Sequence, residues 1–160
     1  MIYSLNEGLN NTAQSISSII NNRIKLIERT ATEIEKSVNS NSKKPNKFLV
    51  DNQKNLSKSF IVATIKKDYY SDNFKSANKK QIAMLMTKCS KDGEYTTRLT
   101  DSKKKISEAV KNTSNEFLIK VNKACNSAIK DVEDGLALLK RYFRTDSIEE
   151  STLFDDINLL

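Results

Sequence analysis

Two long stretches of the chain repeat apolar residues every three or four positions, the spacing that places them along one face of an α-helix. The first stretch spans Leu5–Val38 and the second spans Leu99–Phe143, and neither contains proline. We therefore expect long helices at about residues 4–39 and 97–144, packed as an antiparallel pair. Their apolar stripes consist of Leu5, Leu9, Ala13, Ile16, Ile20, Ile24, Ile27, Ala31, Ile34 and Val38, and of Leu99, Ile106, Val110, Phe117, Val121, Ala124, Ala128, Val132, Leu139 and Tyr142.

The first stripe follows an almost heptad pattern, which two copies of a chain can use to form a coiled coil. The same stripe can instead pack against the second long helix of its own chain. Because both stripes occur in one chain, we favour the internal pair, in which Ile27 and Val121 are buried. A homo-oligomer formed through the long helices remains an open alternative.

The segment between the two stretches predicts shorter helices. Residues 39–46, NSNSKKPN, have the composition of a linker. The weaker stripe of residues 47–70 favours a helix, although SFIVATI at 59–65 also fits a buried strand, for which no partner strand is evident. Another helix is expected over residues 74–90. Its end is expected at Gly93 in the left-handed conformation.

The scarcity of turn-forming residues supports this assignment, since the 160 residues include only three glycines and one proline. We expect an all-α fold: an elongated bundle over residues 1–146 with basic central helices at 47–91, followed by an acidic-apolar tail at 147–160. Gly135 lies inside the second long stretch, where it marks either a kink or a close helix crossing.

The sequence contains no segment that resembles a cleavable signal peptide and no apolar run long enough to span a membrane. We therefore expect a cytoplasmic protein, or one that is exported without a cleavable signal.

Several kinds of catalytic chemistry lack their usual residues. The chain has no histidine, which excludes imidazole bases and His-ligated metals, and it has no glycine-rich phosphate loop. Cys89 and Cys125 fall at or beside apolar positions and are expected to be buried free thiols. The carboxylates of Asp131, Glu133 and Asp134 are expected to be solvated charges on a helix. We therefore expect no enzyme, no catalytic residue, no cofactor and no metal site.

Charge is distributed unevenly along the chain. Residues 43–91 hold twelve lysines and three aspartates, a net charge of +9, whereas residues 145–160 hold five acidic residues and no basic one. The lysines can neutralise phosphates of a nucleic acid or the charges of an anionic surface. This segment lacks arginine, the residue best suited to bidentate phosphate contacts. The candidate anion-binding residues are Lys66, Lys67, Lys75, Lys79 and Lys80.

The tail carries the most distinctive short pattern. Leu153, Ile157 and Leu160 recur at i, i+4 and i+7 with Phe154 beside them, the spacing of a helix that binds in an apolar groove. Carboxylates flank these positions and can steer a basic partner. The candidate partner-binding residues are Leu153, Phe154, Asp155, Asp156, Ile157, Leu159 and Leu160.

The tail also resembles the C-terminal signal of effectors carried by the Dot/Icm type IV secretion system. Those signals favour a glutamate block, here Glu149-Glu150, followed by apolar residues, here Ile157, Leu159 and Leu160. Residues 155–160 also resemble an acidic dileucine sorting signal of eukaryotic membrane traffic. The first resemblance implies a translocated effector and implies nothing about the fold of the rest of the chain.

Taken with the missing catalytic groups, these patterns predict a non-enzymatic helical module that binds a protein partner through its bundle surface and its tail. An adaptor, an assembly factor, a secretion chaperone and a small translocated effector all fit this description. The alternative is a protein that binds nucleic acid or an anionic surface through the central lysines.

Overall fold

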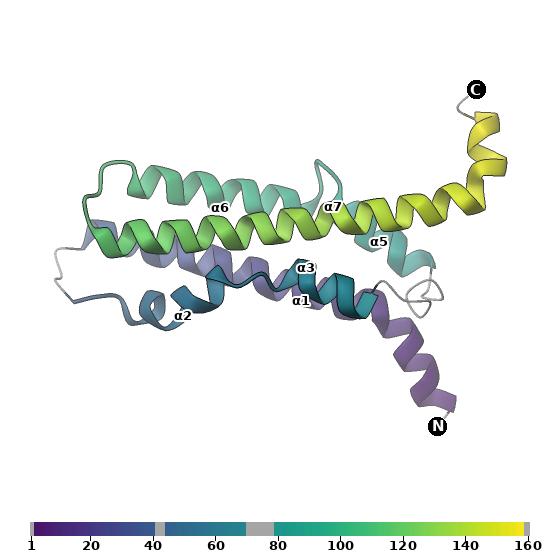
Figure 1. Cartoon of the computed structure of the whole chain (residues 1–160), viewed down its shortest axis with the longest axis horizontal. Coiled ribbons are helices and arrows are strands. Elements are labelled where there is room, and N and C mark those ends of the chain that lie inside the picture. The colour runs from purple at the N-terminus through teal and green to yellow at the C-terminus, as the bar shows by residue number, and fades with distance from the viewer. Residues whose placement is uncertain (1, 41–43, 70–78, 159–160) are drawn as a thin grey trace.

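The computed structural model describes the backbone of residues 2–40, 44–69 and 79–158, and the side chains of residues 15–40, 44–67 and 79–143. Over these ranges the fold is all-α, as the sequence predicts (Figure 1). The described elements are α1 (Ile2–Asn39), α2 (Lys47–Ser57), α3 (Ile61–Thr64), the π-helical turn η1 (Ile65–Tyr69), α5 (Lys79–Cys89), α6 (Glu94–Val110) and α7 (Glu116–Asn158).

The long axis of the molecule is set by α1 and α7, which run antiparallel to one another (Figure 1). The shorter α6 lies along α1, while α2 and α3 follow one another along the other side of α7. α5 packs against α1, α6 and α7 near the end where the chain begins. The body is therefore an elongated bundle, in agreement with the predicted architecture.

The predicted single helix over residues 97–144 is wrong, because the chain turns between α6 and α7 at residues 111–115. Four consecutive polar residues occupy positions 112–115, and side chains of this kind compete with the helical backbone for hydrogen bonds. Asn115 then starts α7, since its Oδ1 accepts hydrogen bonds from the backbone N–H groups of Phe117 and Leu118 at 3.0 and 3.2 Å.

This turn also reverses part of the predicted pairing. α6 runs parallel to α1, as cross-helix contacts that advance together along both chains demonstrate. Tyr95 meets Ser17, and Arg98 meets Glu28, each through side-chain hydrogen bonds. Further along both helices, the Lys105 ammonium donates to the Thr32 hydroxyl. Only α7 is antiparallel to α1, so the predicted antiparallel partner is correct for one of the two helices.

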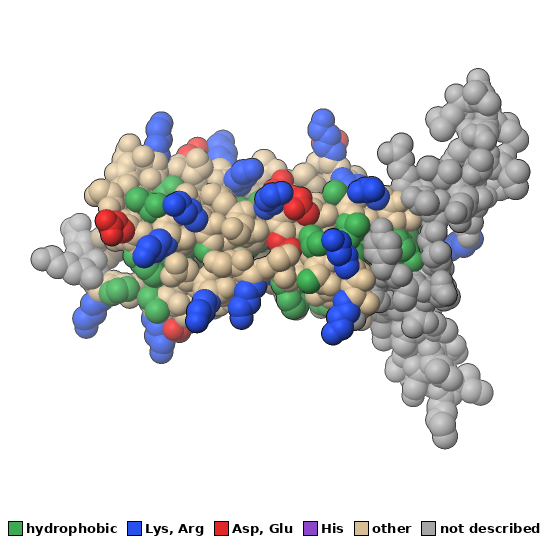
Figure 2. Space-filling model, in the orientation of Figure 1, with side chains coloured by type: hydrophobic (Ala, Val, Ile, Leu, Met, Phe, Trp, Pro, Cys, Tyr) green, Lys and Arg blue, Asp and Glu red, His purple; other side chains and the backbone are tan. Residues whose placement is uncertain are grey.

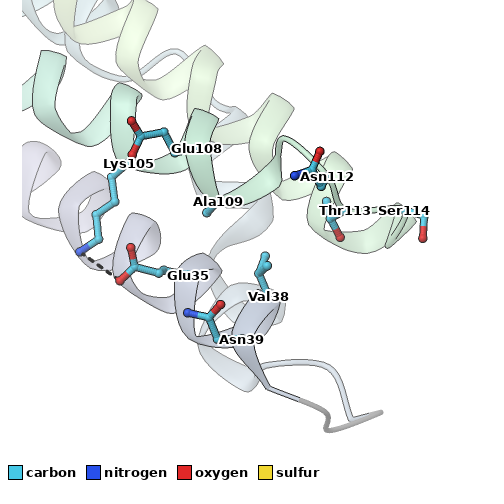
Figure 3. A pocket seen from close by; sticks show the side chains of 9 residues that line it. All are labelled: Glu35, Val38, Asn39, Lys105, Glu108, Ala109, Asn112, Thr113 and Ser114. Atoms are coloured by element: carbon cyan, nitrogen blue, oxygen red, sulfur yellow. Dashed lines mark ion pairs between the residues drawn. The ribbon is translucent and has the colours of Figure 1, made fainter.

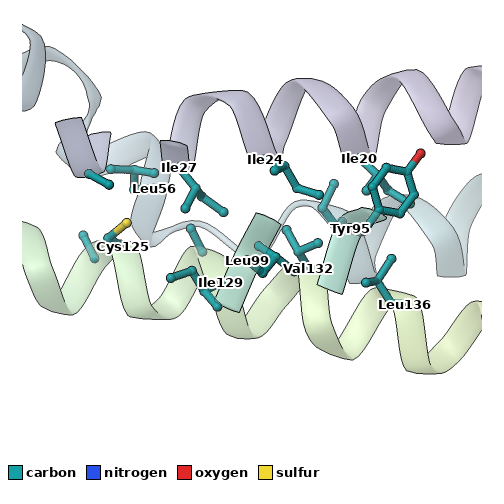
Figure 4. Packing of buried hydrophobic residues seen from close by; sticks show 14 of the residues in the cluster. Ile20, Ile24, Ile27, Leu56, Tyr95, Leu99, Cys125, Ile129, Val132 and Leu136 are labelled. Atoms are coloured by element: carbon teal, nitrogen blue, oxygen red, sulfur yellow. The ribbon is translucent and has the colours of Figure 1, made fainter. Parts of the chain in front are cut away.

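The core lies between α1, α6 and α7, and α2 and α3 close its remaining side (Figure 4). Ile27 and Val121 are fully buried, which confirms the prediction for both. The first stripe packs as expected in the described part of α1, where the buried apolar residues are Ile16, Ile20, Ile24, Ile27, Ala31 and Ile34.

The helix predicted over residues 47–70 forms in two pieces. No part of SFIVATI is a strand: the chain leaves the helix after Ser57, residues 59–60 lie in the break, and the helix resumes at Ile61. This break rotates the second piece. Phe60, expected in the stripe, is 46% exposed, and Ile61 and Ile65 are buried in its place. Its aromatic ring lies 5.9 Å from the guanidinium of Arg23.

Gly93 and Gly135 are the two glycines for which the sequence predicts a structural role. Gly93 precedes α6 with φ of −78°, so the predicted left-handed conformation is wrong. A Cβ there would instead collide with the carbonyl oxygens of Thr87 and Lys88 at the end of α5. A Cβ on Gly135 would lie 2.5 Å from Cγ2 of Ile61, so this glycine permits the close crossing of α3 and α7.

Candidate functional site

Asp131 on α7 accepts four hydrogen bonds from the segment between α2 and α3. It is 6% exposed and lies where α3 begins. Its Oδ2 accepts from the backbone N–H groups of Phe60 and Ile61 at 2.8 and 2.7 Å. Its Oδ1 accepts from the Val62 N–H at 3.1 Å and from the Ser59 hydroxyl at 3.0 Å. Asp131 therefore caps α3 from another helix, and the prediction that it is a solvated charge is wrong.

Whereas Asp131 caps the N-terminal end of α3, Arg23 on α1 caps the C-terminal end of α2. Its Nη2 donates to the carbonyl oxygens of Asn55, Leu56 and Lys58 at 2.8, 3.3 and 3.0 Å. Its Nη1 donates to the side-chain oxygen of Asn55 at 3.2 Å. Burial lowers the pKa of Arg23, and the nearby charge of Asp131 offsets part of this shift. The cation thus binds the end of α2 that carries the negative partial charge.

Together these two side chains hold the break between α2 and α3. We call Arg23, Asp131 and the backbone of residues 55–62 the buried clasp. The carboxylate oxygens of Asp131 are occupied by four donors that belong to the chain. This arrangement anchors a bend and leaves neither oxygen as a base aimed at a ligand.

The two cysteines are free and buried, as predicted. Burial raises the pKa of each thiol to about 12. A thiol of that pKa carries almost no thiolate near neutral pH and is a poor nucleophile. Cys125 lies beside the buried clasp on α7 and Cys89 ends α5, so both serve as small core residues.

Polar pairs join α1 to α6 on the outer face of the bundle. Arg98 contacts Glu28 through two hydrogen bonds of 2.6 and 3.0 Å and also reaches Glu94 and Asn21. The hydrogen bond from Arg98 lowers the pKa of Glu28. These partly exposed contacts fix the parallel register of the two helices.

A cleft lies where the last turns of α1 and α6 meet the connection to α7 (Figure 3). Its volume is about 520 Å³, and Lys105 spans it to reach Glu35 at 3.9 Å. Val38 and Ala109 supply its only apolar side chains among the described residues that line it. A shallow polar lining of this kind lacks the convergent apolar surface of a small-molecule site.

A second depression runs between α1 and α5. It has a volume of about 400 Å³, and its lining includes Ser17, Ser18 and Asn21 on α1, Met84 and Lys88 on α5, and Glu94 at the start of α6. Met84 is 56% exposed, the largest exposed fraction among the large hydrophobic side chains at the described surface. The depression therefore combines small polar residues, an exposed thioether and the Lys88–Glu94 ion pair of 4.0 Å.

The four described lysines among the candidate anion-binding residues lie in pairs on two separate elements. Lys66 and Lys67 are exposed on η1, and Lys79 and Lys80 are exposed at the start of α5. Lys75 lies outside the described residues. On the face shown in Figure 2, Lys and Arg side chains are scattered over the body and do not gather into a single patch.

The candidate residues of the tail lie on or beyond the end of α7. The helix continues without a break to Asn158, so Leu153–Ile157 are helical in backbone. Their side-chain positions, and Leu159 and Leu160 as a whole, lie outside the described residues. Among the described side chains of α7, the last buried ones are those of Tyr142 and Phe143, and Figure 1 shows the end of α7 leaving the body of the bundle.

Comparisons of the chain with protein-family models, with curated proteins and with solved structures find no match. None of the helices in the described part of the chain is long and apolar enough to cross a membrane. Within the same part, no three cysteine or carboxylate side chains are grouped as a metal site would require.

Proposed function

We propose that the protein is a helical interaction module that donates the C-terminal part of α7 to a protein partner. The observation that carries the proposal is the backbone of α7, which stays helical to Asn158, beyond Phe143, the last buried residue among the described side chains of this helix. At 1.5 Å per residue this extension is roughly 22 Å long, about the length of a helical peptide that fills a binding groove.

The sequence of the extension fits this role. Residues 147–160 contain six large apolar residues, and residues 145–160 contain five carboxylates and no basic residue. A helix that only extended into solvent would have no use for this apolar content, which favours aggregation. In a complex, the apolar residues supply most of the affinity and the carboxylates speed the encounter with a basic groove.

The scaffold supports the proposal by its rigidity. The buried clasp and the Arg98–Glu28 pair fix the helices that carry α7. The extension is thus held at a fixed end of the bundle, from which it can also be presented for export, as its resemblance to a secretion signal implies. Binding of nucleic acid through the lysines has less support, because the Lys and Arg side chains on the face shown in Figure 2 are dispersed.

The test compares the full chain with two matched double variants, using affinity capture from lysate of the native host and titration of the recovered partner. Phe154→Ala with Ile157→Ala is expected to abolish binding at every salt concentration. Asp155→Asn with Asp156→Asn is expected mainly to slow association, and less so in high salt. Unchanged binding in both variants contradicts the proposal.

Generic duplex DNA provides the opposing measurement. Steep loss of affinity with rising salt, with no effect of the tail variants, would establish the lysine-based alternative instead.

A further inference from the structure

The side of α5 that faces away from the core carries a continuous exposed stripe. We call Lys80, Ala83, Met84 and Thr87 the α5 stripe, since all four are exposed and their spacing of three, one and three residues places them on one face of the helix. α5 contains three lysines and no acidic residue. The stripe borders the depression that Ser17 and Ser18 line. Lys88 on the flank of the stripe pairs with Glu94 at 4.0 Å, whereas Lys80 lies on the stripe one turn before Met84. A flexible apolar side chain with a lysine one turn before it suits the docking of an acidic amphipathic helix.

The C-terminal part of α7 has the complementary pattern. Glu150 and Phe154 are separated by one helical turn, as Lys80 and Met84 are. In both pairs the charged residue precedes the apolar one by about 6 Å along the axis. Two helices aligned in parallel therefore bring the carboxylate opposite the ammonium group and the aromatic ring opposite the thioether. Ile157 falls on the same face of its helix as Phe154 and extends the apolar contact.

The chain cannot make this contact with itself while α7 stays continuous. α7 packs against α5 on the inner side, where Leu85 and Cys89 are buried. The α5 stripe lies on the opposite side of that helix. Beyond Phe143, α7 leaves the bundle and does not turn back around α5 (Figure 1).

We propose that the α5 stripe receives the C-terminal part of α7 from a second copy of the chain, so that two copies exchange these helices in a two-fold dimer. The inference rests on the proposed function, because the same segment supplies the contact, and it names a second copy as an occupant. Two-fold symmetry uses the contact twice, which doubles the buried apolar surface without any further interface.

Sedimentation velocity of the full chain over a range of concentrations tests the proposal. A dimer is expected that weakens as salt rises. Met84→Asp and the pair Phe154→Ala with Ile157→Ala are each expected to weaken dimerisation about tenfold or more, because each removes a central apolar anchor. Lys80→Glu on the α5 stripe is likewise expected to weaken the dimer. Its matched control is Lys104→Glu, which makes the same charge change at an exposed position of α6 and is expected to leave the dimer intact.

A charge exchange gives the sharper result. Lys80→Glu and Glu150→Lys are each expected to weaken the dimer, and the two together are expected to restore it. Unchanged circular dichroism and melting show that the variants fold. A chain that stays monomeric at its highest soluble concentration overturns the inference, as does a dimer that survives Met84→Asp and the tail variants. A monomer whose tail still binds another protein overturns the dimer alone, whereas inert tail variants overturn the proposed function as well.

Discussion

Replacing Asp131 with asparagine tests the buried clasp with little change in shape. Asparagine keeps one oxygen acceptor and loses the charge and the second acceptor. Oδ1 and Oδ2 each accept two hydrogen bonds, so the variant loses two of the four. Hydrogen bonds to a charged group contribute roughly 1.5–3 kcal/mol each, and the one donated by the Ile61 N–H is buried. We expect the free energy of unfolding to fall by about 3–5 kcal/mol.

Urea denaturation followed by the helical circular-dichroism signal measures this difference. For a chain of this size, about 3 kcal/mol corresponds to a fall in melting temperature of roughly 6–12 °C. Hydrogen exchange adds a local reading, because the amides of Phe60, Ile61 and Val62 donate directly to the carboxylate. Their protection is expected to fall further than that of the α1 core.

Asp134→Asn is the matched control, one turn further along α7. Its carboxylate is exposed and pairs with Lys130 at 3.2 Å, so the substitution is expected to cost less than about 0.5 kcal/mol. If the free energy of unfolding of Asp131→Asn lies within about 1 kcal/mol of the native value and the three amides stay protected, the Asp131 carboxylate does not hold α3.

Three further predictions concern the ion pair of Glu28 with Arg98, the thiols of the two cysteines and the backbone at Gly93. The pKa of Glu28 is lowered in the folded chain, so its pair with Arg98 stabilises fully above the ordinary value of 4.5 and is lost as pH falls through the lowered value. Denaturation of Glu28→Gln is therefore expected to differ from the native chain near neutral pH, by less than about 1 kcal/mol because the pair is exposed, and to converge with it in acid. Iodoacetamide is expected to label Cys89 and Cys125 only in unfolded protein, as mass spectrometry can score. Gly93→Ala is expected to cost about 2 kcal/mol by thermal melting, because its Cβ meets backbone carbonyls.

Hydrophobic spacing predicts the helical elements of this chain well because periodicity is a local property. The spacing of apolar residues does not specify whether two packed helices run parallel or antiparallel. It therefore does not distinguish the parallel packing of α6 on α1 from the antiparallel packing of α7. The break at residues 111–115 was hidden for a related reason. Val110 and Phe117 are seven residues apart, which continues the stripe in phase across a turn. The new helix begins where Oδ1 of Asn115 accepts hydrogen bonds from the backbone N–H groups of Phe117 and Leu118, a contact that apolar spacing does not report.

The sequence places both charged residues of the buried clasp, Arg23 and Asp131, at positions where the helical pattern predicts core residues. Arg23 follows Ile20 by three residues and precedes Ile27 by four, so it occupies a core position of the heptad pattern. Asp131 likewise shares a face of α7 with Ala128 and Gly135, where small residues allow α3 to approach. A charged residue at such a position indicates a paired or capped buried charge. The hydrogen-bond partners of Arg23 and Asp131 lie 32 to 72 residues away in the sequence, and no local pattern specifies them.

The parallel packing of α1 and α6 has a consequence for synthesis of the chain. Ser17 and Tyr95, which meet across these helices, are 78 residues apart in sequence. At about 5–20 residues per second, the ribosome needs roughly 4–16 s to produce the second after the first. During that interval the isoleucine stripe of α1 has neither α6 nor α7 to cover it. The asparagine- and serine-rich opposite face then keeps the nascent helix in water, and a holding chaperone would bind the stripe that the later helices bury.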